Sequence, residues 1–307
     1  MNLFVRTLKH LVWMLNRGKL LHVVPDSAYL KMMYMLELGQ KLDLDNPKTF
    51  NEKLQWLKIN DRKPIYTTMV DKYEVKSYVA NLIGEEYLIP TLGVWDSFDD
   101  IEFDSLPNAF VLKCTHDSGG LVICKNKKDF NISEAKKKIE QCLKFNFYWH
   151  GREWPYKDVK PRIIAEPYIV DKELTELRDY KFFCFSGRVK LLKIDFNRFT
   201  NHQANYYSRD CKLLPVGETA LPYDAKKEIK FPSQYEKMVS LAEKLSTDIP
   251  FVRVDFYQAN EKVLFGEITF YPTSGFGKWS DDNYDVLFGE WIDLNSINKQ
   301  YLSDTEK

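Results

Sequence analysis

Closely spaced pairs of short apolar runs constrain the fold of this 307-residue chain more than any other feature. Turns of two to six residues separate the members of each pair, and connections this short join antiparallel strands. The pairs are 110–114 with 121–124, 180–185 with 188–192, and 251–257 with 262–268. Helical segments lie between the pairs without a strict strand–helix–strand rhythm. The pattern therefore predicts an α+β fold of stacked lobes and disfavours a doubly wound parallel sheet.

The first 95 residues have a different, mainly helical pattern. Apolar residues within 4–15 recur at helical spacing, with basic residues on the other faces. Thr49 and Glu52 have the spacing of an N-terminal capping box, and Gly84 ends a helix predicted for residues 70–82. After this region the pattern changes to strands. We therefore predict a helical N-terminal region (1–95) followed by a part that contains the strands (96–307).

Charge and composition exclude several classes of protein. Forty-four basic residues balance 44 acidic ones, so no net field attracts nucleic acid, and no nucleic-acid partner is expected. The apolar core near the N-terminus, Leu11–Leu15, is too short for a secretory signal or a membrane span. Five widely spaced cysteines favour free thiols, and Cys114, His116 and Cys124 lack an evident fourth zinc ligand. We therefore expect a cytoplasmic protein.

The amphipathic helix near the N-terminus leaves two interpretations open. It carries Arg6, Lys9 and Arg17 on faces away from its apolar residues. Such a helix either caps the core of the domain or lies on an anionic membrane surface. A peripheral contact with the inner membrane is therefore the second expectation for this segment.

Two C-terminal strands carry the strongest chemical signal. Arg253 and Asp255 are two residues apart and project from one face of a strand, as do Glu267 and Thr269 on the next strand. The short turn brings the two pairs together. Carboxylate and hydroxyl oxygens are hard ligands suited to Mg²⁺, and such charges are costly to bury unless they bind something. The alternative is a solvent-facing ladder of salt bridges.

Three weaker signals precede and follow these strands. Lys113 lies in an apolar strand before a Gly-Gly turn, where it meets either solvent or a phosphate, although the turn is not a Walker A sequence. Asp179 and Lys181 place opposite charges on one strand face, which is also typical of a surface ion pair. The loop at 271–278 is rich in small residues able to present backbone N–H groups to an anion.

In their order along the chain, these segments resemble the ATP-grasp superfamily, and most closely its TupA-like (teichuronopeptide biosynthesis) branch. The run Pro47–Leu57 is similar to this branch in particular. The resemblance extends over roughly residues 40–295. It implies an ATP-grasp fold of two stacked α+β lobes, a small lobe (96–175) and a C-terminal catalytic lobe (176–307). The chain before Lys72 has no glycine-rich strand–helix start, so helices replace the domain that precedes many ATP-grasp folds.

The resemblance implies a set of residues that contact ATP. They belong to a lysine-bearing helix, a phosphate-binding strand with its glycine loop, a hinge whose backbone reads the adenine edge, and an acidic-x-basic strand. These residues are Lys72, Lys113, Ser118, Gly119, Gly120, Glu166, Tyr168, Ile169, Asp179 and Lys181. The three lysines would hold phosphates, and Lys181 is also expected to be catalytic.

The resemblance also implies a metal site and further catalytic residues. Asp255, Glu267 and Thr269 would bind Mg²⁺, with Thr269 in the place where the superfamily usually has Asn. The remaining catalytic groups are Arg253 and the backbone at Ser274 and Gly275, which would neutralise charge on the transferring phosphoryl group and on the tetrahedral intermediate.

The implied activity is ATP-dependent ligation of a carboxylate to an amine through an acyl phosphate, with ADP and phosphate as products. The expected partners are a small-molecule or glycan carboxylate, such as a uronic acid, and an amine, such as an amino acid, in surface or capsular polysaccharide biosynthesis. A metal-dependent glycosyltransferase is the alternative, but the only Asp-x-Asp run, Asp43–Asp45, precedes Pro47 in a helical region. A non-catalytic carbohydrate-binding protein would explain the 15% aromatic content but not the ordered charges.

Overall fold

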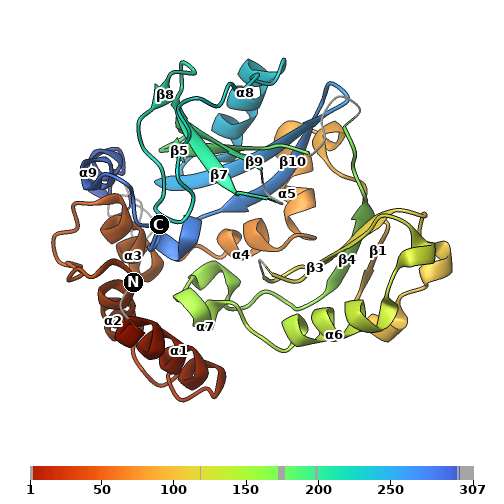
Figure 1. Ribbon diagram of the computed structural model, residues 1–307, viewed down its shortest axis with the longest axis horizontal. Coiled ribbons are helices and arrows are strands. Elements are labelled where there is room, and N and C mark those ends of the chain that lie inside the picture. Colours follow the sequence, from red (N-terminus) through yellow and green to blue (C-terminus); the bar gives the residue numbers. More distant parts are fainter. Residues whose placement is uncertain (1–2, 118, 172–176, 198–199, 296, 298–307) are drawn as a thin grey trace, which may run out of the picture.

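Two antiparallel sheets organise the protein (Figure 1). The computed structural model describes residues 3–117, 119–171, 177–197, 200–295 and 297. The strands are β1 (Gly93–Trp95), β2 (Phe110–Cys114), β3 (Leu121–Cys124), β4 (Ile163–Pro167), β5 (Asp179–Phe185), β6 (Arg188–Phe196), β7 (Gln203–Ser208), β8 (Leu213–Leu214), β9 (Phe251–Ala259) and β10 (Lys262–Thr269). The small sheet has the order β1-β4-β2-β3 and the large sheet the order β10-β9-β5-β6-β7-β8.

Helices precede and flank both sheets. They are α1 (Leu3–Arg17), α2 (Asp26–Leu38), α3 (Phe50–Asn60), α4 (Ile65–Val70), α5 (Val75–Ile83), α6 (Ile132–Leu143), α7 (Tyr148–Gly151), α8 (Tyr235–Leu245) and α9 (Asp282–Glu290). The strand pairings are antiparallel throughout the two sheets. The prediction of an α+β fold of two lobes with a helical N-terminal region is therefore confirmed.

The small sheet is built on the β2–β3 hairpin that the sequence predicts. β2 pairs with β3 on one side and with β4 on the other, which places Lys113 opposite Leu121 and Ile164. Phe110 and Leu112 alternate with Lys113 along β2 and pack into a core that α6 completes through Ile139. Lys113 therefore leaves the opposite face of the sheet, away from α6.

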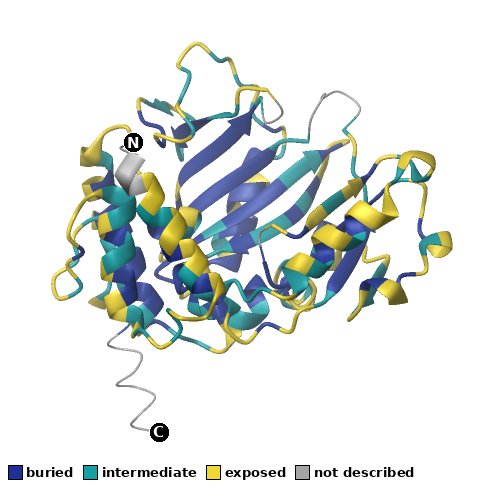
Figure 2. Cartoon of the chain, turned by 60° about the horizontal axis from the view of Figure 1, so that its bottom comes forward, coloured by how far each residue is buried: buried dark blue, intermediate teal, exposed yellow. Residues whose placement is uncertain are grey.

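The large sheet has an apolar face and a second, charged face, on which Lys181 and Asp255 lie beside buried aromatic residues such as Phe183. Figure 2 shows that the strands of the large sheet are buried along most of their length. α8 lies against β5, β6 and β9, and Phe182, Val254 and Phe256 are fully buried on these strands. The residues that alternate with them, Lys181 and Asp255 among them, project to the other side. This second face is the one that carries the predicted chemistry.

The helix predicted for residues 70–82 is wrong as one continuous element. The helix α5 begins only at Val75, whereas Val70 is the last residue of α4, and the backbone of Asp71 between them is extended. The Asp71 carboxylate accepts hydrogen bonds from the backbone N–H groups of Tyr73 and Glu74, at 2.8 and 3.1 Å. This local turn competes with helix continuation, as Asp side chains commonly do. The break places Lys72 in a turn, where its backbone N–H donates to the Thr115 carbonyl at 3.1 Å.

The N-terminal helices are fixed to the C-terminal lobe and to the segment around α7. The predicted capping box is confirmed, because Thr49 and Glu52 satisfy each other's backbone N–H groups at the start of α3. α3 contacts α9 and the short turn Pro272–Gly275. Tyr29 of α2 donates to the carbonyl of His150 at 2.9 Å. No helix in the described ranges is both long and apolar enough to cross a bilayer.

Candidate active site

Two cavities lie beside the charged face of the large sheet and share three residues. The small cavity, of about 160 Å³, is lined by the turn before α5, the small sheet and strands β9 and β10. The large cavity, of about 480 Å³, is lined by β9 and β10, the 271–276 loop, α2 and the segment 147–156. Lys72, Asp117 and Glu267 line both. The cavities therefore meet at one charged junction.

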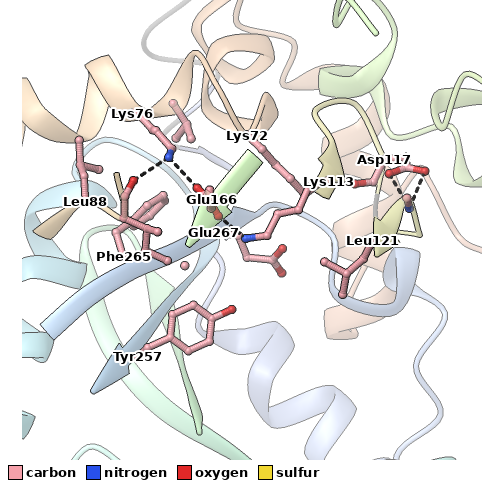
Figure 3. A pocket seen from close by; sticks show the side chains of 14 residues that line it. Lys72, Lys76, Leu88, Lys113, Asp117, Leu121, Glu166, Tyr257, Phe265 and Glu267 are labelled. Atoms are coloured by element: carbon pink, nitrogen blue, oxygen red, sulfur yellow. Dashed lines mark hydrogen bonds and ion pairs between the residues drawn. The ribbon is translucent and has the colours of Figure 1, made fainter. Parts of the chain in front are cut away.

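Glu166 organises the charges of the small cavity (Figure 3). Its two carboxylate oxygens each pair with one lysine, Lys113 and Lys76, at 2.6 Å. Burial alone would raise the pKa of Glu166, but the two lysines hold it below its ordinary value. Burial lowers the pKa of Lys76, and Glu166 opposes that change. Beside this charged cluster, the cavity has walls of Leu88, Ile89, Leu121, Tyr257 and Phe265.

Asp117 holds the predicted glycine loop in shape. Both of its carboxylate oxygens accept the backbone N–H of Gly120 at 3.0 Å, and its carbonyl accepts a hydrogen bond from Nζ of Lys72. A Cβ atom at Gly120 would lie 2.6 Å from Sγ of Cys114, so only glycine fits there. Ser118 of this loop lies outside the described residues. Gly119 lines neither the small nor the large cavity.

Strands β9 and β10 place the predicted Arg253, Asp255, Glu267 and Thr269 side by side. Glu267 lies opposite Asp255 and Thr269 opposite Arg253 in the pairing. The Arg253 guanidinium donates to both oxygens of Asp255, at 2.7 and 2.8 Å, and to Glu267 at 2.6 Å. Thr269 donates its hydroxyl proton to the same oxygen of Glu267 at 3.0 Å. A single guanidinium therefore links two carboxylates on neighbouring strands.

The two carboxylates differ in their surroundings. The Glu267 side chain is 44% exposed and opens into both cavities, whereas the Asp255 side chain is 3% exposed and lines neither of those described. Burial raises the pKa of Asp255 to about 6, although Arg253 and Lys181 oppose this change. The protein around Glu267 also removes part of its water, but Arg253, Lys72 and Lys181 hold its pKa below the ordinary value. Glu267 therefore stays charged at the junction.

By chemical type this donor set suits a magnesium ion, although Arg253 occupies both oxygens of Asp255. Two carboxylates and a hydroxyl oxygen on adjacent strands are hard ligands of the kind that Mg²⁺ takes. Glu267 and Thr269 face the large cavity, and Asp255 lies directly opposite Glu267. Glu267 is the residue of the three that reaches both cavities, so we expect it to be the first ligand.

The ammonium group of Lys181, which was expected to hold a phosphate, is buried among carboxylates. Its Nζ pairs with Asp179 at 2.7 Å, Asp195 at 3.2 Å and Asp255 at 3.5 Å, and it lines neither described cavity. Asp195 was missed because the strand predicted for 188–192 continues to Phe196. The longer strand places Asp195 beside Asp179 on the charged face, where His202 also contacts it at 3.1 Å.

The Thr273–Gly275 turn presents its side chains to the large cavity. Thr273 and Ser274 both have φ of 51°, and Gly275 has φ of 64°. A Cβ at Gly275 would lie 2.5 Å from the amide nitrogen of Gln55, which explains the glycine. Ser274 lines the cavity, and its hydroxyl donates to Glu153 at 2.6 Å. The carbonyl of Ser274 accepts a hydrogen bond from Lys58 at 2.7 Å.

Some predicted residues lie outside the described cavities. Tyr168 and Ile169 follow β4 and line neither cavity, and the backbone N–H of Tyr168 donates to the carbonyl of Ala109 at 3.4 Å. The Asp-x-Asp run forms a turn in which Asp43 accepts the N–H groups of Asp45 and Asn46, at 3.0 and 2.9 Å. The roles of Tyr168 and Ile169 in ATP binding stay predictions. The turn at Asp43–Asp45 agrees with the interpretation of this run as the segment that precedes a helix.

Two facing sheets with a lysine-lined cavity between them and paired carboxylates on neighbouring strands define an ATP-grasp protein. The sequence profile of the TupA-like ATPgrasp family matches residues 52–293 of the chain. The protein belongs to this family. A search of the curated proteins returns no match.

Solved structures similar to the chain include three bacterial ligases and synthetases. D-alanine–D-alanine ligase from Helicobacter pylori is 15% identical, with 83% of this chain and 69% of that chain covered and a TM-score of 0.41. N5-carboxyaminoimidazole synthetase from Staphylococcus aureus is 17% identical, with 66% and 44% covered and a TM-score of 0.35. D-alanine–D-alanine ligase from Bacillus anthracis, complexed with ATP, is 12% identical, with 75% and 66% covered and a TM-score of 0.41.

Proposed function

We propose that the protein is an ATP-dependent ligase that joins a carboxylate to an amine through an acyl phosphate. Membership in an ATP-grasp family supports ATP-dependent ligation in general. The observation that carries the proposal is the junction at Lys72, Asp117 and Glu267, where the two cavities meet. A nucleotide in the small cavity and an acceptor in the large one would present a phosphoryl group and a carboxylate to the same charged residues.

The residues of the small cavity can bind a nucleotide. Lys113, Lys76 and Lys72 supply three ammonium groups for phosphate oxygens, and the apolar walls provide a surface for a base. Lys113 and Lys76 are already held by Glu166, so they are positioned before a phosphate arrives. A bound Mg²⁺ at Glu267, Asp255 and Thr269 would supply positive charge to the phosphoryl group that moves.

Arg253 and Ser274 can orient the acceptor. Both line the large cavity, beside Glu267 and Thr269. The planar guanidinium suits the two oxygens of a carboxylate, and its charge would also stabilise the oxyanion of the tetrahedral intermediate. The proposed products are an amide, ADP and inorganic phosphate.

The proposed acceptor is a uronic acid or a related sugar acid, and the amine is an amino acid or another small amine. Phe147, Tyr156, Tyr271 and Phe276 line the large cavity. Flat aromatic faces together with carboxylates suit a saccharide ring, whose apolar face stacks and whose hydroxyl groups donate hydrogen bonds. This composition supports a role in surface or capsular polysaccharide biosynthesis.

The proposed location is the cytoplasm, with the inner membrane surface as a second contact. Leu11, Trp13 and Met14 of α1 are about half exposed, between 45 and 52%. Arg17 lies over the Trp13 ring at 4.8 Å. An exposed apolar face beside basic residues is the arrangement by which a helix lies on an anionic bilayer.

Replacing Lys113 with Met should weaken ATP–Mg²⁺ binding by about 10- to 100-fold, because one charge-assisted phosphate contact is lost. Glu166 keeps its second partner, Lys76, so the fold should survive. Calorimetric titration with ATP–Mg²⁺ measures the effect. Lys190→Met, at an exposed lysine of β6, is the matched control and should bind as the wild type does. Equal affinities of the two variants would remove Lys113 from the site.

The reaction class is tested by trapping the acyl phosphate. With ATP, Mg²⁺ and a panel of uronic acids and amino acids, hydroxylamine should yield a hydroxamate and one ADP for each hydroxamate formed. Release of AMP and pyrophosphate would contradict an acyl phosphate. Consumption of a nucleotide sugar with transfer of its glycosyl group, and no ADP release on any carboxylate, would replace the ligase with the glycosyltransferase.

A further inference from the structure

Glu153 is a buried carboxylate in the wall of the large cavity with no cation in direct contact. It is 3% exposed, and among the described residues its carboxylate accepts a hydrogen bond from the Ser274 hydroxyl at 2.6 Å. No ion pair of Glu153 occurs among the residues that the structure describes. A buried carboxylate without a close cation is costly, by several kcal/mol in typical cases, and a cationic ligand would offset this cost.

The nearest lysine on α3 does not fill this role. Nζ of Lys58 donates to three oxygens, those of Gln55, Gly151 and Ser274, at 2.7–2.8 Å. An ammonium has three protons, so these bonds use all of them. The Lys58 charge therefore acts on Glu153 only through space. The absence of a side chain at Gly151 allows Ser274 to pack closely, because a Cβ there would lie 2.8 Å from the Ser274 hydroxyl oxygen.

The other charges of the cavity are already engaged. Arg253 binds Asp255 and Glu267, and Glu37 pairs with Lys9 at 2.5 Å. The titratable groups that face Glu153 are Lys58, Arg253, Glu267, Tyr156, Tyr271 and His150. Burial lowers the pKa of His150, so this imidazole is a weak base. Burial raises the pKa of Glu153 above its ordinary value, although Lys58 and Ser274 oppose this change.

We propose that Glu153 binds the ammonium group of the amine substrate and accepts its proton before the attack. The inference rests on the proposed ligase function and assigns the amine subsite of that reaction. A carboxylate among aromatic faces, here Tyr156, Tyr271 and Phe147, is the chemistry that recognises an ammonium ion. A raised carboxylate pKa also suits a base that works near neutral pH.

Every bond and proton of this step is accounted for. One N–H bond of the ammonium breaks, and its proton moves to a carboxylate oxygen of Glu153, which leaves a lone pair on nitrogen. This pair forms the C–N bond to the acyl carbon. The C–O bond to the phosphoryl group then breaks, and its electrons stay with the departing phosphate. The phosphate takes the second nitrogen proton, and Glu153 returns its own to solvent.

The experiment measures the Glu153→Gln variant with two nucleophiles, an amino acid and hydroxylamine. In both assays the acceptor is a carboxylate that supports ADP release by the wild type. Hydroxylamine is largely unprotonated at neutral pH and needs no base, whereas an amino acid arrives as an ammonium ion. We expect amide formation to fall about 10²- to 10⁴-fold and hydroxamate formation to change by less than about 10-fold. Glu228→Gln, at an exposed glutamate, is the matched control and should leave both rates unchanged.

The pH profile separates a base from a merely structural residue. In the wild type the amide rate should fall as the pH drops through the raised pKa of Glu153, and the hydroxamate rate should lack this acidic limb. Ser274→Ala keeps the carboxylate but removes its hydrogen bond, so the limb should move to higher pH. If Glu153→Gln does not fold, the pH profile of Ser274→Ala tests whether Glu153 is the base.

The two proposals fail in different ways. A parallel loss of amide and hydroxamate formation in Glu153→Gln, or an acidic limb that Ser274→Ala leaves in place, would overturn the assignment of Glu153 alone. An acidic limb that disappears in His150→Gln would also overturn it. Absence of ADP formation by the wild type with every carboxylate would overturn the ligase function, and the inference with it.

Discussion

Glu267→Gln should lower the rate of ADP formation by about 10³-fold or more. Glu267 lines both cavities and receives hydrogen bonds from Arg253 and Thr269. The amide keeps the shape of the side chain but removes the charge that would hold Mg²⁺ beside the transferring phosphoryl group. ATP affinity should fall far less than turnover, because the lysines of the small cavity remain.

The measurement is turnover by coupled ADP detection, together with ATP affinity by calorimetry. Glu261→Gln, in the exposed turn between β9 and β10, is the matched control and should keep full activity. A folded Glu267→Gln variant with more than about a tenth of wild-type turnover would contradict the role of this residue, since a metal or phosphoryl contact of this kind contributes at least about 100-fold.

Arg253→Met should abolish activity and also lower the free energy of unfolding by about 3 kcal/mol. Arg253 is the bidentate partner of Asp255, whose side chain is 3% exposed, so the variant leaves a buried carboxylate with Lys181 as its remaining close cation. Arg253→Lys should retain more stability but little activity, because a single ammonium cannot reproduce the two parallel hydrogen bonds.

The stability loss in Arg253→Met should depend on pH. The pKa of Asp255 is about 6 in the folded protein and lies above the value of an exposed carboxyl. The folded state therefore binds more protons than the unfolded state between these two values, and protonation on lowering the pH relieves the cost of the buried charge. Removing Arg253 raises this pKa further, so the stability difference from the wild type should be smaller at pH 5 than at pH 8.

Urea denaturation of wild type, Arg253→Met and Arg253→Lys at the two pH values gives the free energies directly. A loss that is equal at both pH values would show that Asp255 does not titrate as described. Wild-type turnover in Arg253→Met would contradict the placement of the guanidinium at the reacting groups.

The charged face of β9 and β10 could be predicted from the sequence because it depends on local geometry. A period of two residues along each strand, with a short turn between them, fixes which side chains share a face. The structure accordingly brings Arg253, Asp255, Glu267 and Thr269 together. The α+β fold followed from the same hairpin spacings.

The remaining residues of the site depend on contacts between distant segments. Glu153 meets Ser274 across 121 positions of the chain, and no periodic pattern marks it. Asp117 lies in a turn whose composition indicated only a tight connection, and its contact with Lys72 spans 45 positions. The wall that α2 supplies to the large cavity depends on how the N-terminal helices pack against the segment 147–156. The spacing of residues along the sequence does not predict any of these contacts between distant segments.

Transfer of an oxygen atom from the acceptor carboxylate to inorganic phosphate tests the central claim most directly. The acceptor is labelled with ¹⁸O in its carboxyl group and incubated with ATP, Mg²⁺, the amine and the protein. An acyl phosphate intermediate requires that one labelled oxygen leave with the phosphate for every amide formed. Labelled phosphate in a one-to-one ratio with ADP is the predicted result. Unlabelled phosphate, with both labelled oxygens retained in the acceptor, would contradict the proposed reaction.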